Sequence, residues 1–326
     1  MSERQGPRWS MVVIAVAVMA TAVAYVAARH GGEAGEVRAN APEKPSAGWR
    51  VWTRDGEGVF RTHRLVATDS GFTDKAPRTG LHILWTGLEA QLRVEERRLR
   101  LCDCEAHMKK PDYFDKPCTT LVDSGKSDGL FIVTDDERVQ IVKPTSELRK
   151  EEDTNTGDFD HTIGVVAIIG DQILYTDSVS EYSCGAAHGT YGTTFHVYDM
   201  RTRREIDWAA WPETTQATTE LRPRAFRELK AKETFAEKAE ELNITALFPR
   251  FDPARGLVVD VQFTGDACYA CSDGWTAYTT STRIASPFIP SAWDPFVAMP
   301  ETVRAFAAKN DKLELLGWAK DVKSPQ

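Results

Sequence analysis

The stretch Val165-Val-Ala-Ile-Ile169, Gly170-Asp171, Ile173-Leu-Tyr-Thr176 is the clearest structural signal in the chain. Two apolar runs flank a Gly-Asp corner, and glycine supplies the positive φ that a tight hairpin requires. Residues 178–182 continue the second strand, and Thr193–Tyr198 resume as a strand after a loop of small residues at 185–192. The pattern predicts an antiparallel meander.

The segments around this meander predict an α+β fold. Pro223 is predicted to open an amphipathic helix that runs to about Leu242 and packs on the sheet. Leu257–Phe263 is a further predicted strand, and Pro300–Ala308 a short helix. Upstream, residues 49–160 are predicted to form a β-rich lobe, with a hairpin at 130–142 and a bulge or turn near 95–98. The polar segment 150–160 is predicted to be a loop, and residues 161–326 to be the α+β domain.

The N-terminus predicts export. Trp9 to Ala28 is an uncharged run long enough to cross a bilayer as a helix, and Arg4 and Arg8 favour a cytoplasmic start. We expect 1–8 to be a cytoplasmic stub, 9–28 a transmembrane anchor and 29–48 a flexible linker, with the remaining chain extracytoplasmic (periplasmic). The alternative is a signal peptide cleaved near Ala28, which would secrete the protein.

The net charge of −8 argues against nucleic acid as a partner, because an acidic chain without a basic stripe repels phosphate.

The six cysteines all follow the predicted span, and an even number in an oxidising compartment favours disulfides. They are Cys102, Cys104, Cys118, Cys184, Cys268 and Cys271. Six cysteines allow 15 pairings, and the sequence does not choose among them. Cys102 and Cys104 are two residues apart, so on a strand they would share a face and could not easily bond to each other. A bridge from Cys104 to Cys118 would close a short loop.

The same cysteines suit two other uses, a metal site and a redox-active pair. Cys102, Cys104, His107 and Cys118 resemble a zinc ligand set, but the spacing matches no standard knuckle, so no metal or cofactor is expected. Cys268-Tyr-Ala-Cys271 has the spacing of thiol oxidoreductases. A turn at 272–274 follows where such enzymes have a helix, so a structural disulfide is favoured.

Two motifs carry a family resemblance. Tyr182-x-x-Gly185-x-Ala187-His188-Gly189 follows the hairpin, and Phe195-x-Val-Tyr-Asp199 follows the loop. Together with the order of helix and strand, they make residues 163–308 resemble the RsiV-like extracytoplasmic domain of unknown function. That domain occurs in RsiV-type anti-sigma factors and beside PdaC-type deacetylase domains. The family usually has glycines where Ala186 and Arg203 stand.

The resemblance implies a binding module. An anti-sigma role is not expected, because a sigma-binding domain would need more than residues 1–8 before the span. Candidate ligand-loop residues are Tyr182, Gly185, His188 and Gly189, with Trp208 and Trp211 as a stacking platform for sugar rings. The alternative for these two tryptophans is packing in the core.

No catalytic motif is present. The sequence has no Gly-x-Ser-x-Gly elbow, no phosphate-binding Gly-Lys-Ser/Thr loop, no dinucleotide fingerprint and no paired-histidine zinc motif. We therefore expect a non-catalytic, membrane-anchored extracytoplasmic domain that binds a cell-envelope protein or a cell-wall glycan. The alternatives are an enzyme that uses Cys184 and His188 or a cysteine-bound metal, and a thiol oxidoreductase that uses Cys268 and Cys271.

Overall fold

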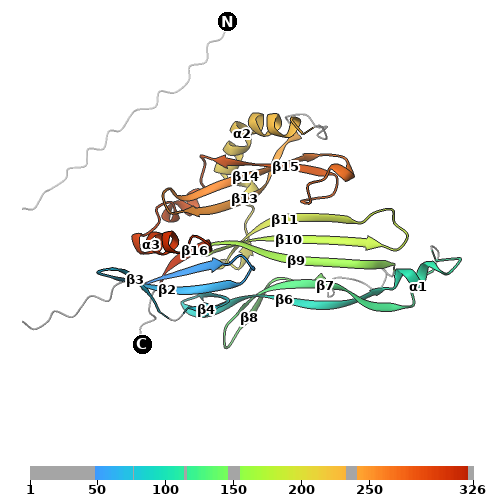
Figure 1. Ribbon diagram of the computed structural model, residues 1–326, viewed down its shortest axis with the longest axis horizontal. Helices are drawn as coiled ribbons and strands as arrows, with labels where there is room; N and C mark the ends of the chain where they lie inside the picture. The colour runs from blue at the N-terminus through green and yellow to red at the C-terminus, as the bar shows by residue number, and fades with distance from the viewer. Residues whose placement is uncertain (1–47, 76, 114–115, 146–154, 233–240, 322–326) are drawn as a thin grey trace, which may run out of the picture. The chain divides into compact units, whose positions relative to one another are not determined.

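The predicted meander is present in the computed structural model (Figure 1). Strands β9 (Thr156–Ile169) and β10 (Gln172–Ser183) pair antiparallel on either side of Gly170. The φ of Gly170 is 60°, the positive value that this corner needs. Strand β11 (Thr190–Asp199) then pairs antiparallel with β10.

The structure describes residues 48–75, 77–113, 116–145, 155–232 and 241–321. The predicted stub 1–8, the predicted span 9–28 and the predicted linker up to residue 47 lie outside these ranges. Within them, no helix combines the length and apolar character of a membrane span.

The meander belongs to an eight-stranded sheet, with strand order β12-β11-β10-β9-β7-β6-β5 and β8 paired to β7. Its further strands are β5 (Leu81–Trp85), β6 (Leu88–Cys102), β7 (Leu121–Val133), β8 (Arg138–Val142) and β12 (Arg204–Glu205). The hairpin predicted at 130–142 is formed by β7 and β8. Strands β7 and β9 pair parallel over Gly125–Ser127 and join the two halves of the sheet.

Two smaller sheets complete the β structure. A five-stranded sheet has the order β16-β1-β2-β3 with β4 paired to β2, and a three-stranded sheet has the order β13-β14-β15. Their strands are β1 (Gly48–Arg54), β2 (Phe60–Thr68), β3 (Gly71–Asp74), β4 (Arg78–Thr79), β13 (Asn243–Asp252), β14 (Gly256–Asp266), β15 (Thr279–Ser286) and β16 (Glu314–Asp321). Helices are few and lie apart from the strands, so the fold class is α+β as predicted.

The predicted lobe boundary at 160/161 is wrong. Residue 160 lies inside β9, whose first residues belong to the segment that was predicted to be a loop. Strand β9 pairs with β7 from the first half of the chain, and β1 pairs with β16 from its end. Residues 45–326 therefore form one compact unit, because pairing between distant strands joins the two parts that the sequence suggested.

Three α-helices are described: α1 (Cys104–Met108), α2 (Pro212–Lys230) and α3 (Glu301–Lys309). The predicted start of α2 at Pro223 is wrong. Pro212 occupies the first turn, and Pro223 lies inside the helix. Proline is tolerated in the first turn because an N–H there has no partner within the helix. Pro223 removes a hydrogen bond inside the helix, and the buried face, which includes Ala217, Ala225 and Leu229, packs into the core and holds the helix together. Residues 233–240 of the predicted helix lie outside the described ranges.

The bulge predicted near residues 95–98 lies slightly later. Strand β6 is continuous through this segment, and its register against β7 shifts between Leu99 and Arg100. A second bulge, in the β9–β10 pairing, has a larger consequence. It lies opposite Leu174/Tyr175, so Val165 and Ala167 reach different hydrophobic clusters although they are two residues apart.

Arg203 stands where the RsiV-like pattern usually has glycine, and it has the left-handed backbone conformation that glycine adopts readily, with a φ of 58°. A left-handed conformation costs free energy for a residue with a Cβ. The side chain makes compensating contacts: the guanidinium donates to Glu137 at 2.8 Å and lies 5.0 Å from the ring of Trp85.

Candidate functional site

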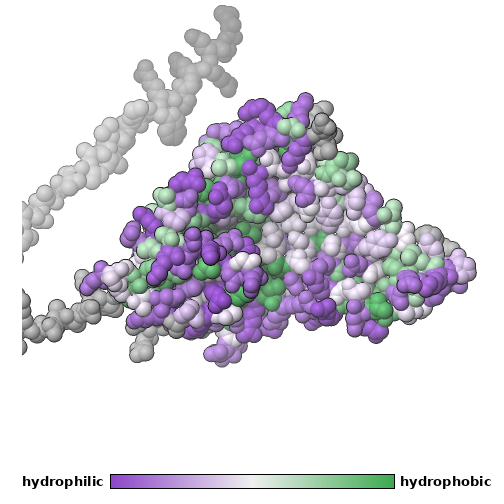
Figure 2. Space-filling view, viewed as in Figure 1, coloured by the Kyte–Doolittle hydropathy of each residue, from purple (hydrophilic) through white to green (hydrophobic). Residues whose placement is uncertain are grey.

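A groove of about 400 Å³ lies on one face of the meander. It is lined by Asp160, Thr162, Ser178, Val179, Ser180, Tyr191, Gly192, Thr193 and Gly274. Five of these nine residues carry a side-chain hydroxyl group. Figure 2 shows pale residues of intermediate hydropathy between the three-stranded sheet and β11, where strongly hydrophilic residues are fewer. The groove is therefore suited to an uncharged, hydrogen-bonding ligand.

Strand register places the hydroxyl groups in rows. Ser178 stands opposite both Thr162 on β9 and Thr193 on β11. Two residues further along, Ser180 stands opposite both Asp160 and Tyr191. Because side chains alternate across a strand, these two rows face the same way. The Oγ of Ser178 lies 2.9 Å from the Oγ1 of Thr193, so these two hydroxyls are hydrogen-bonded to each other.

A short segment after β14, residues 267–278, covers one side of the groove. It contacts β11 through a bridge between Gly192 and Thr276 and through the amide of Ala277, which donates to the carbonyl of Tyr191 at 2.9 Å. The Cys268–Cys271 disulfide closes a 3₁₀ turn at Tyr269–Cys271 within it. We call residues 267–278 the cover segment.

Asp273 holds the cover segment in place. Its carboxylate accepts hydrogen bonds from the amide of Trp275 at 3.2 Å and from the amide and hydroxyl of Ser281 at 2.5 Å. Partial burial raises the pKa of Asp273. The hydrogen bonds from Ser281 and Trp275 lower the pKa by more than burial raises it, so the pKa of Asp273 is below its ordinary value of 3.8. The charged form is thus the one that the fold stabilises.

Acid is therefore expected to loosen the cover segment. A lowered pKa contributes stability that is complete above the ordinary aspartate value of 3.8 and is lost as the pH falls below it. We expect the amides of Trp275 and Ser281 to lose protection from hydrogen exchange in that range. Asp273→Asn should show the loss already at neutral pH, whereas Asp266→Asn, at an exposed neighbouring site, should not. Equal protection in both variants would contradict this role.

Two aromatic rings of the cover segment, Tyr269 and Tyr278, cluster with His188 and with Tyr191, which lines the groove. The ring of His188 stacks on Tyr269 with centroids 3.9 Å apart, and the hydroxyl of Tyr278 lies 3.0 Å from His188 Nε2. Tyr191 meets the edge of Tyr269 at 6.3 Å. Tyr278 is 49% exposed and has a φ of 64°, an uncommon conformation for an aromatic residue. This cluster offers ring faces and hydroxyls to a ligand.

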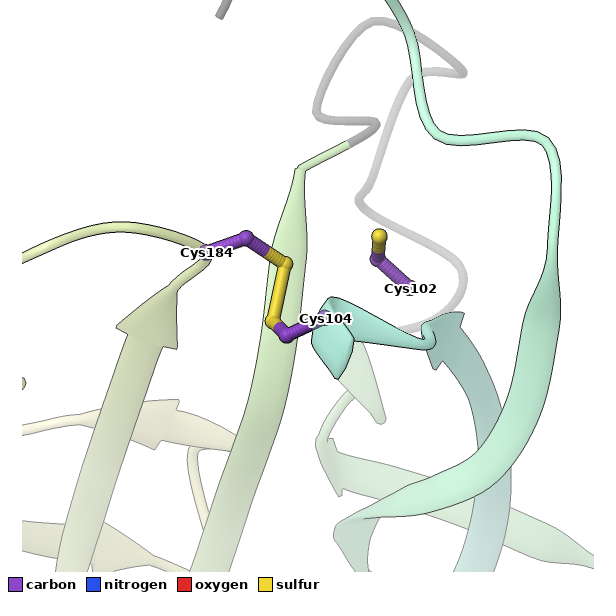
Figure 3. A group of neighbouring side chains, drawn as sticks. All are labelled: Cys102, Cys104 and Cys184. Atoms are coloured by element: carbon purple, nitrogen blue, oxygen red, sulfur yellow. A yellow bond between two sulfur atoms is a disulfide. The ribbon is translucent and has the colours of Figure 1, made fainter. Parts of the chain in front are cut away.

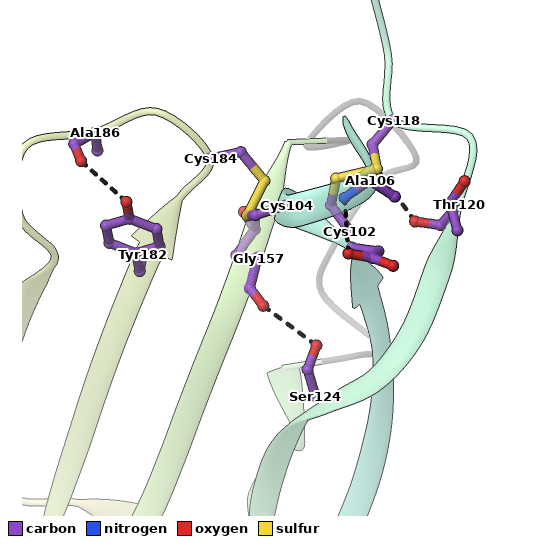
Figure 4. Close-up of a disulfide and its surroundings, with 12 residues drawn as sticks. Cys102, Cys104, Ala106, Cys118, Thr120, Ser124, Gly157, Tyr182, Cys184 and Ala186 are labelled. Atoms are coloured by element: carbon purple, nitrogen blue, oxygen red, sulfur yellow. Dashed lines mark hydrogen bonds between the residues drawn. A yellow bond between two sulfur atoms is a disulfide. The ribbon is translucent and has the colours of Figure 1, made fainter. Parts of the chain in front are cut away.

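The predicted ligand loop is only partly at this site. His188 belongs to the aromatic cluster, and Gly189 lies where a Cβ would come 2.8 Å from the carbonyl of Glu181. Tyr182 donates its hydroxyl to the carbonyl of Ala186 at 3.0 Å, so it braces the loop from within (Figure 4). Gly185 has a φ of 83° and makes the turn. Gly189 therefore allows the loop to approach the backbone of β10 closely, and Gly185 allows the chain to turn.

The two predicted platform tryptophans do not line the groove. Trp208 donates its indole N–H to the carbonyl of Phe195 at 3.1 Å and meets that ring edge-on. Trp211 meets Trp293 edge-on at 5.6 Å. Both pack against the larger hydrophobic cluster, which agrees with the core alternative for these residues.

All six cysteines are paired: Cys102 with Cys118, Cys104 with Cys184, and Cys268 with Cys271. The Cys104–Cys118 bridge considered from the sequence is not formed. Asp103 caps α1 and turns the chain there, so Cys104 reaches the end of β10 while Cys102 stays at the end of β6 (Figure 4). Because Cys184 is bonded to Cys104, it is not a free thiol for His188 to activate.

A buried Ser–His–Asp arrangement joins β7, β9 and β10. The Nδ1 of His161 lies 2.8 Å from the Oγ of Ser127, and its Nε2 lies 3.0 Å from Asp177 Oδ1, although that last contact is not aligned as a hydrogen bond. Ser127 has no exposed surface and accepts from the amide of Thr145 at 2.7 Å. No substrate reaches such a hydroxyl, so this arrangement ties strands together.

The groove residues were missed by sequence reasoning. The available signal was the alternation of hydroxyl side chains, with Ser178 and Ser180 on one strand and Tyr191 and Thr193 on the next. Hydroxyl side chains at every second position predict only that one face of a strand is polar and exposed. They do not predict that a distant segment of the chain lies against that face.

No family model matches the sequence, and no curated protein matches it. Among solved structures, a DUF3298 family protein from Pseudomonas aeruginosa PAO1 is similar, with 11% identity and a TM-score of 0.32. The match covers 65% of this chain and 95% of that protein. Similarity at this level establishes neither the family nor the function of the chain.

Proposed function

We propose that the chain is a membrane-anchored extracytoplasmic protein that binds a cell-wall glycan in the groove between β9–β11 and the cover segment. The observation that carries the proposal is the pair of hydroxyl rows beside a cluster of aromatic rings. Sugars present hydroxyls that pair with such rows and C–H faces that pack on aromatic rings.

Three further observations support this function. The sequence of residues 163–308 resembles RsiV-like domains, which are regarded as binding modules. The three disulfides suit an oxidising compartment, in agreement with the predicted export segment. The carboxylate of Asp160 in the groove lies 3.2 Å from Lys126 Nζ, so an uncharged sugar would meet no unpaired charge there.

Two neighbouring threonines on β11 provide a matched test. Thr193 lines the groove and contacts Ser178, whereas Thr194 is exposed on the other side of the strand. Thr193→Val removes a hydrogen-bonding hydroxyl at nearly constant volume. We expect about three- to tenfold weaker binding from the loss of one hydrogen bond worth about 1 kcal/mol, and no change from Thr194→Val.

The measurement is co-sedimentation of residues 45–326 with purified peptidoglycan sacculi, with circular dichroism to verify that each variant is folded. Soluble envelope proteins serve as competing ligands in a second series. Identical retention of the two threonine variants would place the binding site elsewhere. If sacculi do not retain the parent protein and an envelope protein binds it, the ligand is a protein and the glycan proposal is wrong.

A further inference from the structure

Two disulfides lie side by side where β6 ends and α1 begins. The Sγ atoms of Cys102, Cys104 and Cys184 are all within 4.8 Å of one another, although Cys102 is bonded to Cys118 and not to either of them (Figure 3). Strand β9 passes directly beside them at Gly157, where any Cβ would collide with the Sγ of Cys104. None of these residues lines the groove.

His107 is buried against the first of these disulfides. Its side chain is on α1, it is 1% exposed, and neither ring nitrogen has a hydrogen-bond partner. One of its nitrogens and the Sγ atoms of Cys102 and Cys118 all lie within 4.8 Å of one another. A buried imidazole without a partner is unfavourable, and a bound ion is one of the standard explanations for such a group.

We propose that Cys102, His107 and Cys118 form a zinc site when the Cys102–Cys118 disulfide is reduced. Two thiolates and one imidazole are ligands that Zn²⁺ prefers, and tetrahedral coordination with Zn–S bonds of about 2.3 Å separates two sulfurs by about 3.8 Å. The ligand atoms already lie within 4.8 Å of one another, so small movements bring them into place. A water molecule completes the coordination.

The structure as described is the oxidised form, which does not offer thiolates to a metal. A dithiol reductant converts the Cys102–Cys118 disulfide to two thiols and is itself oxidised to a disulfide. Zinc then binds as the two thiols lose their protons to solvent. The metal restores a cross-link between the same two positions, so the loop between them stays closed in both forms.

The test uses the full chain, purified in mild detergent, with Cys268→Ser and Cys271→Ser to remove the separate CxxC pair. It is reduced on an immobilised dithiol resin and then given one equivalent of Zn²⁺. We expect one zinc per chain by atomic emission after gel filtration, and less than about one tenth of an equivalent in the oxidised protein. Co²⁺ in place of Zn²⁺ should give thiolate-to-metal charge-transfer absorption.

His107→Phe is the discriminating variant, and His188→Phe is its matched control, because His188 is exposed and lies outside the Cys102–His107–Cys118 group. We expect His107→Phe to weaken zinc binding at least about 100-fold, because it removes a direct ligand, and His188→Phe to leave it unchanged. His107→Asn provides a second variant of smaller size if His107→Phe does not fold. Zinc binding that is absent, that is equal in the His107 variants, or that occurs only in a chain unfolded by circular dichroism overturns the proposal.

Discussion

Replacement of both Cys104 and Cys184 by alanine is expected to lower the free energy of unfolding by about 4–5 kcal/mol. This disulfide joins residues 80 apart in the sequence and connects α1 to the end of β10. In the loop-entropy description, a cross-link restricts the unfolded chain more strongly when it closes a longer loop. Urea denaturation followed by circular dichroism measures the change.

The other two disulfides provide an internal scale for this prediction. Cys102–Cys118 spans 16 residues and should contribute about 3 kcal/mol, and Cys268–Cys271 spans 3 residues and should contribute about 2 kcal/mol. The three double-alanine variants should therefore rank by loop length. If Cys268→Ala/Cys271→Ala were the most destabilised, the loop-entropy account would be wrong for this protein, and local strain or lost contacts would explain the differences.

Replacement of Asp321 by alanine is the second change with a large expected effect. Asp321 on β16 accepts from Arg50 at 3.2 Å and from Arg64 Nε at 2.8 Å. Arg50 is only 2% exposed, so its charge depends on this carboxylate, with Glu89 a more distant partner at 3.8 Å. Removing one member of a buried ion pair leaves an uncompensated charge, and we expect a loss of about 3–5 kcal/mol.

Glu314→Ala is the matched control, because the same two strands carry it. Glu314 pairs with Arg54 at 2.6 and 2.8 Å, which is a shorter contact than that between Asp321 and Arg50. It is 55% exposed, so water replaces the lost partner and the expected loss is at most about 1 kcal/mol. Chemical denaturation of both variants shows whether the burial of an ion pair or its N–O distance decides how much free energy of unfolding is lost. Losses of equal size would show that Arg50 is not dependent on Asp321.

Local signals predicted much of the secondary structure. Gly170 marked the β9–β10 corner, the hairpin predicted at 130–142 is formed by β7 and β8, and Pro300 marked the start of α3. Each of these depends on the conformational limits of a few adjacent residues, so each is visible in the sequence. The start of α2 was misplaced because two prolines, Pro212 and Pro223, carry the same local signal, and only packing of the helix decides between them.

For the cysteines too, local sequence predicted some features and only the tertiary structure decided others. The sequence established their even number and the difficulty of joining Cys102 to Cys104, and disulfides are indeed present. The partner of Cys184 could not be derived, because its distance from Cys104 depends on how β10, β9, β7 and β6 are ordered in the sheet. The separation of lobes at residue 160 failed for the same reason, since a parallel pairing such as that of β7 and β9 leaves no local mark.

The sequence by itself determined the α+β class, the meander, the supply of cysteines and the apolar run at residues 9–28 that predicts export. Only the tertiary structure decided that the cover segment lies against β11 at one side of the hydroxyl rows of β9–β11, and that His107 lies buried beside the Cys102–Cys118 disulfide. The physical reason is that backbone conformation depends on neighbouring residues. A site depends instead on which distant strands pair, and that is decided by the burial of side chains over the whole unit.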